Sequence, residues 1–407
     1  MNSLDELILK WQEGSLGAEE LRQLNLLLAR PENRAVLREE FLLTAGLAAA
    51  SRSPESKIVP MGAEEPVRPG VRWVAALAAC LALGLLIFAF RPDQPVSFAA
   101  ERTISSGDVE ELLNLDAGAT VLRLQPNSLL QVVSLTGQKQ FRLERGSLRA
   151  QVAPQREPMR IFTSQAEAVI LGTEFVLSAL SNSTRLDVSE GLVRFKRVAD
   201  GSALDVSARQ FAAVSPGLRF APASLPPAPW HDRPIGDVAM HGAAFVEGGK
   251  CLLKGAGRNT CLQKDQLQFL YQAIEGDFEL RARLISFDGK AANARAGIMV
   301  RRSLQTACRQ AFLSYRGDGQ LEIQCRPETE SQELFTAPVT LPVTLRITRS
   351  GPDLRFAISE NDVEWREIGQ EKVDFGNAVF AGLAVTSFNS EVMNESLFED
   401  FSLSLGN

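Results

Sequence analysis

Histidine is almost absent from this chain: 407 residues include only two, His231 and His241. Zinc sites and Ser-His-Asp triads usually need histidine, and two histidines are too few to favour either kind of site. No Cys-x-x-Cys pair occurs either. The net charge is −6 and no run rich in Lys and Arg is present, which argues against a nucleic-acid-binding surface. We therefore expect no metal, no cofactor and no nucleic-acid partner.

Cysteine is also sparse, with five residues. Cys80 falls in a long apolar stretch, where a small buried side chain is its ordinary role. The other four, Cys251, Cys261, Cys308 and Cys325, all follow that stretch. In an oxidising compartment they allow two disulfides with three connectivities. We expect the pairs that are closest in sequence, Cys251–Cys261 and Cys308–Cys325.

Charge is missing from one long run, Trp73–Phe90 (WVAALAACLALGLLIFAF). A helix of this length nearly crosses the ~30 Å hydrocarbon core of a bilayer. A cleaved signal peptide would lie nearer the N-terminus, and a buried core helix this long would carry a polar residue. The run therefore predicts one transmembrane helix over residues 71–90. Basic residues are denser before it than after it, so we expect the N-terminus in the cytoplasm and the rest of the chain on the outer, periplasmic side of the inner membrane.

Helical periodicity dominates residues 1–50. Three short amphipathic helices are predicted there, with apolar faces that carry Leu7, Trp11, Leu21, Leu24, Leu28 and Phe41. A core this small is marginal, and apolar surface that it leaves uncovered favours a protein partner, although an independently stable bundle is the alternative. Residues 51–70 are rich in Pro, Ser, Gly and charge, which indicates a flexible linker.

Strand periodicity dominates the chain from residue 96 onward. Residues 141–152 alternate apolar and polar side chains around a predicted glycine turn at Gly146, and similar short runs continue to residue 220. They favour a sandwich, a jelly roll or a short solenoid. Residues 221–230 form a Pro-rich linker, and ten further predicted strands in residues 231–407 favour a two-sheet jelly roll. The expected fold class is thus multidomain: a small N-terminal α-helical bundle, one transmembrane helix, then two all-β domains.

A family resemblance rests on four segments of residues 96–220. They are Glu144–Ala150 (ERGSLRA), Ile161–Ser164 (IFTS), Ala168–Val176 (AVILGTEFV) and Ser189–Phe195 (SEGLVRF). In this order they look like the FecR domain, and residues 1–50 more loosely resemble the cytoplasmic anti-sigma portion of FecR-type regulators. The motif residues carried by the resemblance are Gly146, Leu171, Gly172, Thr173, Glu174, Phe175, Glu190 and Gly191.

The FecR resemblance implies a single-pass sensor whose outer domain reports to an inner anti-sigma domain. The implied partner of the inner helices is an extracytoplasmic-function sigma factor. FecR proteins that are coupled to outer-membrane transporters end in a segment that meets the transporter, whereas this chain continues into another β domain. Iron-siderophore signalling is therefore not implied. Glu174 and Glu190 have no nucleophile or metal partner in sequence, so we expect a structural corner rather than a catalytic pair.

Residues 231–407 resemble concanavalin A-like (laminin-G-like) modules of bacterial surface proteins, through segments such as Gly276–Arg283 (GDFELRAR) and Ala296–Arg301 (AGIMVR). That fold hosts lectins, enzymes and spacers alike. Glu360–Glu364 has the spacing of a glucanase motif, but its surroundings predict a hairpin tip, which cannot hold two carboxylates rigidly in a cleft. We expect no enzyme activity. Arg281, Arg283, Arg301 and Arg302 predict a solvated sheet face, with an acidic glycan site as the alternative.

Two functions follow from these patterns. The first is a membrane sensor that controls a sigma factor in response to an outer signal, which would be a carbohydrate or an envelope protein. The second is an envelope-anchored glycan-binding or adhesion protein without a sigma-factor role.

Overall fold

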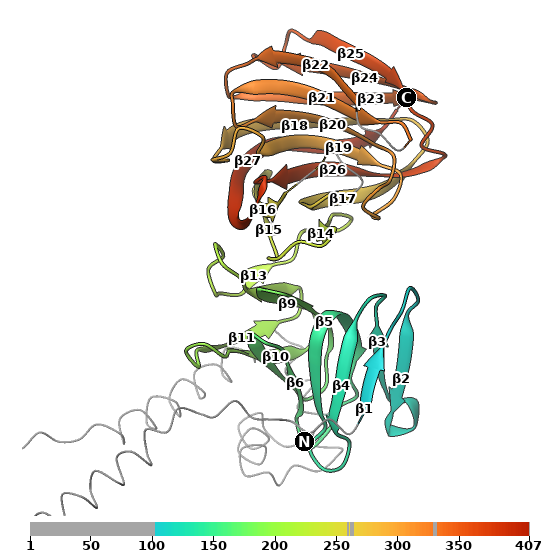
Figure 1. The fold of residues 1–407 in the computed structure, drawn as a ribbon, viewed down its shortest axis with the longest axis vertical. Helices are drawn as coiled ribbons and strands as arrows, with labels where there is room; N and C mark the ends of the chain where they lie inside the picture. Colours follow the sequence, from blue (N-terminus) through green and yellow to red (C-terminus); the bar gives the residue numbers. More distant parts are fainter. Residues whose placement is uncertain (1–101, 259, 261–263, 329–331, 407) are drawn as a thin grey trace, which may run out of the picture. The chain divides into compact units, whose positions relative to one another are not determined.

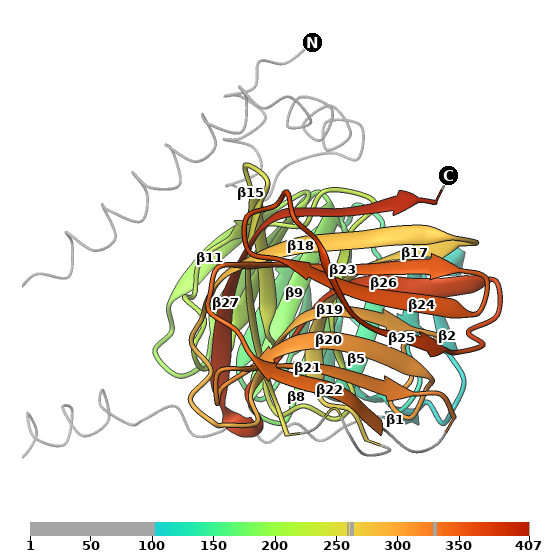
Figure 2. The same cartoon turned by 90° about the horizontal axis from the view of Figure 1, so that it is seen from above.

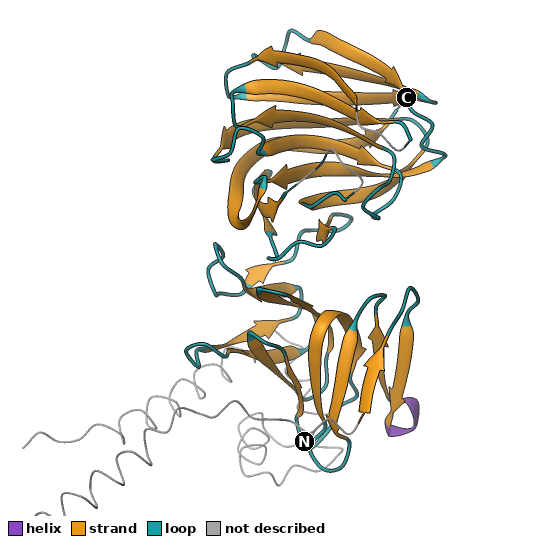
Figure 3. Ribbon diagram, in the orientation of Figure 1, coloured by secondary structure: helices purple, strands orange, loops and turns teal. Residues whose placement is uncertain are grey.

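The computed structural model describes residues 102–406, except 259, 261–263 and 329–331. The chain divides into two compact units, Met1–Ala99 and Ala100–Asn407, and all described residues lie in the second. Their regular secondary structure is almost all strand (Figures 1 and 3), and their single helix is the three-residue 3₁₀ turn η1 (Asp116–Gly118). We call residues 102–224 the first β domain and residues 231–405 the second β domain.

The strands of the first β domain are β1 (Arg102–Ser105), β2 (Glu111–Leu115), β3 (Thr120–Leu124), β4 (Leu129–Ser134), β5 (Gln140–Gln151), β6 (Met159–Phe162), β7 (Ala166–Ile170), β8 (Glu174–Leu180), β9 (Ser183–Glu190), β10 (Leu192–Arg197), β11 (Ala203–Ser207), β12 (Gln210–Val214) and β13 (Ala223–Ser224).

The first β domain is built around the long strand β5. Its first half pairs with β4 and, in parallel, with β6. Its second half pairs with β3 and β8. The two halves belong to one continuous 13-stranded sheet that bends at Gly146. Apolar side chains of both halves, including Phe141, Phe175 and Phe195, are fully buried in one core. The period-two alternation of these strands produces that core, because every second side chain points to the same face.

The strands of the second β domain are β14 (His231–Ile235), β15 (Ala243–Glu247), β16 (Lys250–Gly257), β17 (Leu267–Glu275), β18 (Phe278–Phe287), β19 (Arg295–Arg301), β20 (Gln310–Arg316), β21 (Gln320–Arg326), β22 (Gln332–Pro338), β23 (Val343–Ser350), β24 (Asp353–Ser359), β25 (Arg366–Lys372), β26 (Ala378–Thr386) and β27 (Asn389–Leu405).

The second β domain is a sandwich of two seven-stranded antiparallel sheets (Figures 1 and 2). One sheet has the order β14-β17-β26-β19-β20-β21-β22, and the other has the order β15-β16-β27-β18-β23-β24-β25. Ile298 and Leu383 of the first sheet share a fully buried core with Phe278, Phe356 and Phe398 of the second. Face-to-face packing of two such inner faces is the usual core of a sandwich.

The predicted fold class is wrong for the structure. It combined a helical bundle and a transmembrane helix with β domains, whereas the described part of the chain is almost entirely strand. The predicted bundle (residues 1–50) and the apolar run Trp73–Phe90 both lie outside the described residues. Across residues 102–406, apart from the gaps named above, no helix has the length and apolar character needed to cross a bilayer.

Candidate functional site

Gly146 and Ser128 form the corner at which β5 bends. Gly146 has a φ of +91°, and a Cβ placed on it would lie 2.5 Å from the Ser128 Cα. The Ser128 Oγ accepts the Ser147 N–H at 2.9 Å, which fills the space that a side chain would need. Only glycine combines a left-handed φ with so close an approach of two backbones. The first motif residue is therefore structural.

The remaining motif residues form a second corner, between β7 and β8. Thr173 is buried, and it exchanges two backbone hydrogen bonds with Val152, at 2.9 and 3.1 Å. A Cβ on Gly172 would lie 2.8 Å from the Pro154 Cα. Gly191, at a φ of +84°, packs on Thr173 in the same way, with a Cβ only 2.6 Å from its Cγ2. The segment thus ties the start of β8 to the end of β5.

Glu174 and Glu190 face each other across β8 and β9. They are register partners at a point where the register shifts, and Glu190 is exposed. Phe175, the next residue, is fully buried in the core, and Leu171 accepts the Gln155 N–H at 2.9 Å. An open strand end of this kind gives neither carboxylate the enclosed, water-excluding surroundings that a catalytic pair needs.

A buried charge cluster joins the two β domains at β9 and β14. The side chain of Arg185 is 4 % exposed; its Nε donates to Asp187 and its Nη1 to Asp232, each at 2.7 Å. Asp232 is fully buried, and it also accepts the Ala244 N–H and the Gln268 amide. Burial alone would lower the pKa of Arg185, but the two carboxylates outweigh burial and raise it. The guanidinium therefore stays charged at the domain junction.

His241 lies beside this cluster and is buried. The backbone N–H of His241 donates to the Ser183 Oγ at 2.8 Å, and the ring Nδ1 of His241 lies 2.8 Å from the same oxygen. Since the Ser183 oxygen already accepts one proton, its own hydroxyl hydrogen is available for Nδ1, which suits a neutral imidazole. Burial, followed by the positive charge of Arg185, lowers the pKa of His241 to about 3.

The stability of the junction should fall in acid because of His241. Between pH 6.5 and about 3 the folded ring stays neutral while the unfolded ring takes up a proton, so the free energy of unfolding decreases as the pH falls. The free energy of unfolding then changes by up to ~1.4 kcal/mol per pH unit. From pH 7 to pH 4.5, wild type should lose about 2 kcal/mol more than His241→Gln in urea denaturation.

The His241→Gln comparison isolates one group. Burial, opposed by Arg185, raises the pKa of Asp187, which adds stability as the pH falls, but this contribution is present in both proteins and cancels in the difference. Equal losses of stability in wild type and variant would show that His241 is not held neutral.

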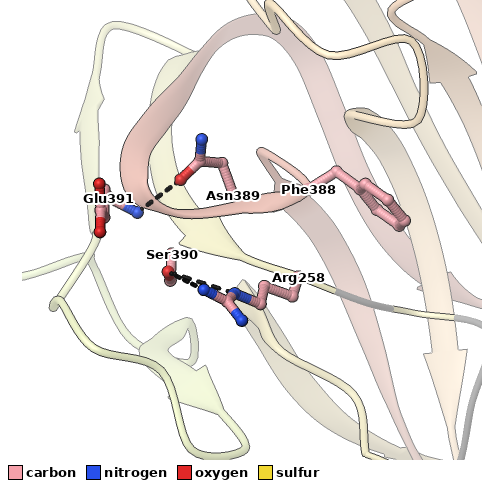
Figure 4. Close-up of a pocket in the computed structure, with 5 residues that line it drawn as sticks. All are labelled: Arg258, Phe388, Asn389, Ser390 and Glu391. Atoms are coloured by element: carbon pink, nitrogen blue, oxygen red, sulfur yellow. Dashed lines mark hydrogen bonds between the residues drawn. The ribbon is translucent and has the colours of Figure 1, made fainter.

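A polar pocket opens in the second β domain where β27 begins (Figure 4). Its volume is about 460 Å³, and the described residues that line it are Arg258, Phe388, Asn389, Ser390 and Glu391. The guanidinium of Arg258 points at Ser390 and donates to its Oγ at 3.0 and 3.2 Å. The Oδ1 of Asn389 accepts the Glu391 N–H at 2.7 Å. The lining therefore offers a cation, a carboxylate, an amide and a hydroxyl, whereas the partly exposed ring of Phe388 points away from Arg258 and Ser390 (Figure 4).

The Glu360–Glu364 run forms the predicted turn, between β24 and β25. Its middle residue, Asp362, has a φ of +63°, and Arg281 and Arg283 of β18 hold its carboxylate. Glu360 and Glu364 are both exposed. The two outer carboxylates are therefore on the surface of a hairpin tip, where no cleft encloses them.

The prediction of a solvated arginine face is wrong for Arg301. Its side chain is fully buried, and so is that of Arg326. Both guanidiniums bind the buried carboxylate of Asp265, and Arg301 also donates to the backbone oxygens of Gln305 and Thr306, at 2.7 and 3.1 Å. Strand alternation identifies which face a side chain is on, but it does not show that loops cover that face.

The cysteines do not form the predicted pair Cys308–Cys325. Cys251, Cys308 and Cys325 have free thiols, and Cys261 lies outside the described residues. Cys325 points into the core between the two sheets, whereas the Cys308 thiol donates to the Ser303 oxygen in the loop before β20. Burial raises the pKa of Cys325 to about 12 and also raises that of Cys251. Both buried thiols are therefore protonated and unreactive at neutral pH.

Other predicted site residues are not described by the structure. Leu7, Trp11, Leu21, Leu24, Leu28 and Phe41, the expected sigma-factor-binding positions, all lie outside the described residues. Conversely, no sequence motif singles out Arg185 and Asp232. The available signals were two charged residues, Arg185 and Asp187, on one face of a predicted strand, and the two histidines close to the Pro-rich linker.

Comparison with solved structures finds distant likenesses. A functionally unknown protein from Saccharomyces cerevisiae is 18% identical over 40% of this chain and 92% of that chain, with a TM-score of 0.36. A putative anti-sigma factor from Parabacteroides distasonis ATCC 8503 is 18% identical over 30% of this chain and 59% of that chain, with a TM-score of 0.28. The carbohydrate binding module CBM66 from Bacillus subtilis is 13% identical over 43% of this chain and 94% of that chain, with a TM-score of 0.31. TM-scores this low do not establish a shared fold. No curated protein matches the chain.

The family comparison is specific to one part of the chain. Residues 102–194 match the FecR protein family, and this range covers the first nine strands of the first β domain and the start of β10. Both glycine corners lie inside it, at Gly146 and at Gly172 with Gly191. The similarity to the FecR protein family is therefore confined to residues 102–194 of this chain.

Proposed function

We propose that this protein controls an extracytoplasmic-function sigma factor in response to a signal that its β domains receive. The observation that carries the proposal is the FecR match over residues 102–194. The FecR family supports a regulatory role in sigma-factor signalling. The proposal assigns sigma-factor binding to the apolar helix faces predicted in residues 1–50, and it places these residues in the cytoplasm and residues 102–407 outside the cytoplasmic membrane.

The proposed receiver of the signal is the second β domain. Its pocket beside Arg258 offers hydrogen-bonding groups of several kinds. Such a lining suits a polyhydroxylated ligand such as a carbohydrate, because a few placed polar groups orient a ligand in its site. We propose no catalytic step for this domain, since Glu360 and Glu364 lie exposed at a turn.

Co-expression with the extracytoplasmic-function sigma factors of the same genome, one at a time, tests the proposal. The full chain, solubilised in detergent, should co-purify with the sigma factor at one to one. A Leu21→Glu, Leu24→Glu variant should retain less than about a tenth of it, because charges on an apolar contact face are costly to bury. Control substitutions at exposed positions of the second β domain should leave binding unchanged. A folded wild-type chain that captures no sigma factor would contradict the proposal.

The alternative is a glycan-binding or adhesion protein without a sigma-factor role. It shares the proposed ligand pocket, so ligand binding alone does not separate the two functions. Capture of a sigma factor does separate them, because the alternative predicts none under any condition.

A further inference from the structure

A Pro-rich connection links the two β domains, and side chains of the two domains contact each other beside it. We call this contact region the joint. Pro222, Pro226, Pro227 and Pro229 fall between β12 and β14. A connection of this composition acts as a semi-rigid spacer, but by itself it leaves the relative rotation of two domains free. What fixes the joint must therefore come from contacts across it.

Arg185 supplies the central contact. It is the residue of the first β domain that donates to Asp232 of the second, and it also donates to the Gly242 carbonyl at 3.2 Å. Its guanidinium lies 4.2 Å from the centre of the Phe211 ring, which in turn lies 5.8 Å from the ring of Phe245 in the second β domain. The ion pair is thus covered by the Phe211 ring, against which the Phe245 ring packs at a tilt of 45°. A charge pair removed from water has no hydrated alternative geometry, so it favours a single arrangement of its partners.

Neutral hydrogen bonds surround that ion pair. The Ser215 Oγ donates to the His241 carbonyl at 2.9 Å, and the Asn182 N–H donates to the Ala239 carbonyl at 3.1 Å. Met393 of β27 packs with Leu218, which follows β12. On the first β domain these contacts come from the turn before β9 and the segment after β12; on the second they come from the segment before β15 and from β27. They therefore restrain the joint about more than one axis.

We propose that Arg185 and Asp232 form a latch that holds the two β domains as one rigid body. A ligand on the second β domain would then move the first β domain with it, rather than change the angle between them. The latch is a property of residues 102–405 and does not depend on sigma-factor binding. Its failure and the failure of the proposed function are therefore distinguishable.

Distances between spin labels on the two domains test the latch in the full chain. Val198→Cys and Val363→Cys place labels at exposed positions, 56 % and 80 % exposed, in the first and second β domains. Cys80, Cys261 and Cys308 are replaced by Ser to limit labelling elsewhere. The latched protein should give one narrow distance distribution. Arg185→Ala should broaden it at least twofold, because Asp232 then has no charge partner across the joint.

The matched control is Arg123→Ala, which removes an ion pair with Glu110 that lies on the surface of the same domain. It should leave the distribution narrow. If Arg185→Ala fails to fold, Arg185→Lys replaces it, since lysine keeps the charge but cannot donate to Asp187 and Asp232 from a planar fork. A broad distribution in the wild-type background, or an unchanged narrow one in a folded Arg185→Ala or Arg185→Lys variant, would overturn the proposal.

Discussion

Asp265→Ala should lower the free energy of unfolding of the second β domain by about 3–5 kcal/mol. The Asp265 carboxylate is fully buried between Arg301 and Arg326, whose side chains are also fully buried. Removing it leaves two guanidiniums in the protein interior without that shared counter-charge, and a buried charge that loses its partner is among the most destabilising defects in a folded chain. Of the four tryptophans, Trp230 and Trp365 lie in or beside this domain and none lies in the first β domain. With Trp11 and Trp73 replaced by Phe, tryptophan fluorescence during urea denaturation therefore measures the relevant transition.

A surface ion pair in the same domain provides the control. Asp353 lies 3.4 Å from Lys372, and both side chains are well exposed. Asp353→Ala should change the free energy of unfolding by less than about 1 kcal/mol, since exposed pairs are screened by water and salt. If Asp265→Ala were as mild as Asp353→Ala, the buried cluster would contribute little to the domain.

Gly146→Ala should lower the free energy of unfolding of the first β domain by roughly 3 kcal/mol, since strain at a positive φ and overpacking each cost about 1–3 kcal/mol. The added Cβ would meet the Ser128 backbone at 2.5 Å, and neither backbone can move without parting β4 from β5. Far-UV circular dichroism during urea denaturation should show the loss as an earlier first transition, while the tryptophan-monitored transition stays in place.

Gly118 makes a matched control because its φ is also +91°, but a Cβ there meets nothing within 4 Å. Gly118→Ala should therefore cost only the backbone strain, about 1 kcal/mol. Equal effects of the two substitutions would mean that the close approach to Ser128 adds no cost, and that Gly146 is needed only because its φ is positive.

Much of the strand content could be predicted from the sequence because it depends on local patterns. The apolar alternation on both sides of Gly146 is confirmed in β5 (Gln140–Gln151), but the predicted turn at Gly146 is wrong, because the strand continues through this residue and only bends there. The turn at Glu360–Glu364 could be predicted in the same way, because apolar strands flank a short polar run. Such features need only neighbours in sequence.

The domain joint and the arginine cluster were not predictable in the same way. Arg185, on a strand, has the pattern of a solvated side chain, and its burial depends on which element covers that face. Asp232 follows the Pro-rich linker, 47 residues later, and becomes its partner only through the docking of two domains. Arg301 is buried because loop backbone around Gln305 and Thr306 folds over its end of the sheet. Contacts between segments distant in sequence leave little trace in local periodicity.

The central claim is that this chain regulates a sigma factor, and the most direct test is transcription in cells. Deleting its gene should change the transcripts of one extracytoplasmic-function sigma regulon by at least about tenfold, because a tenfold excess of bound over free sigma factor needs binding only about 1.4 kcal/mol more favourable than half-saturation. Re-expressing the full chain should restore wild-type levels, and the Leu21→Glu, Leu24→Glu variant should not. No change in any sigma-dependent transcript on deletion would contradict the account.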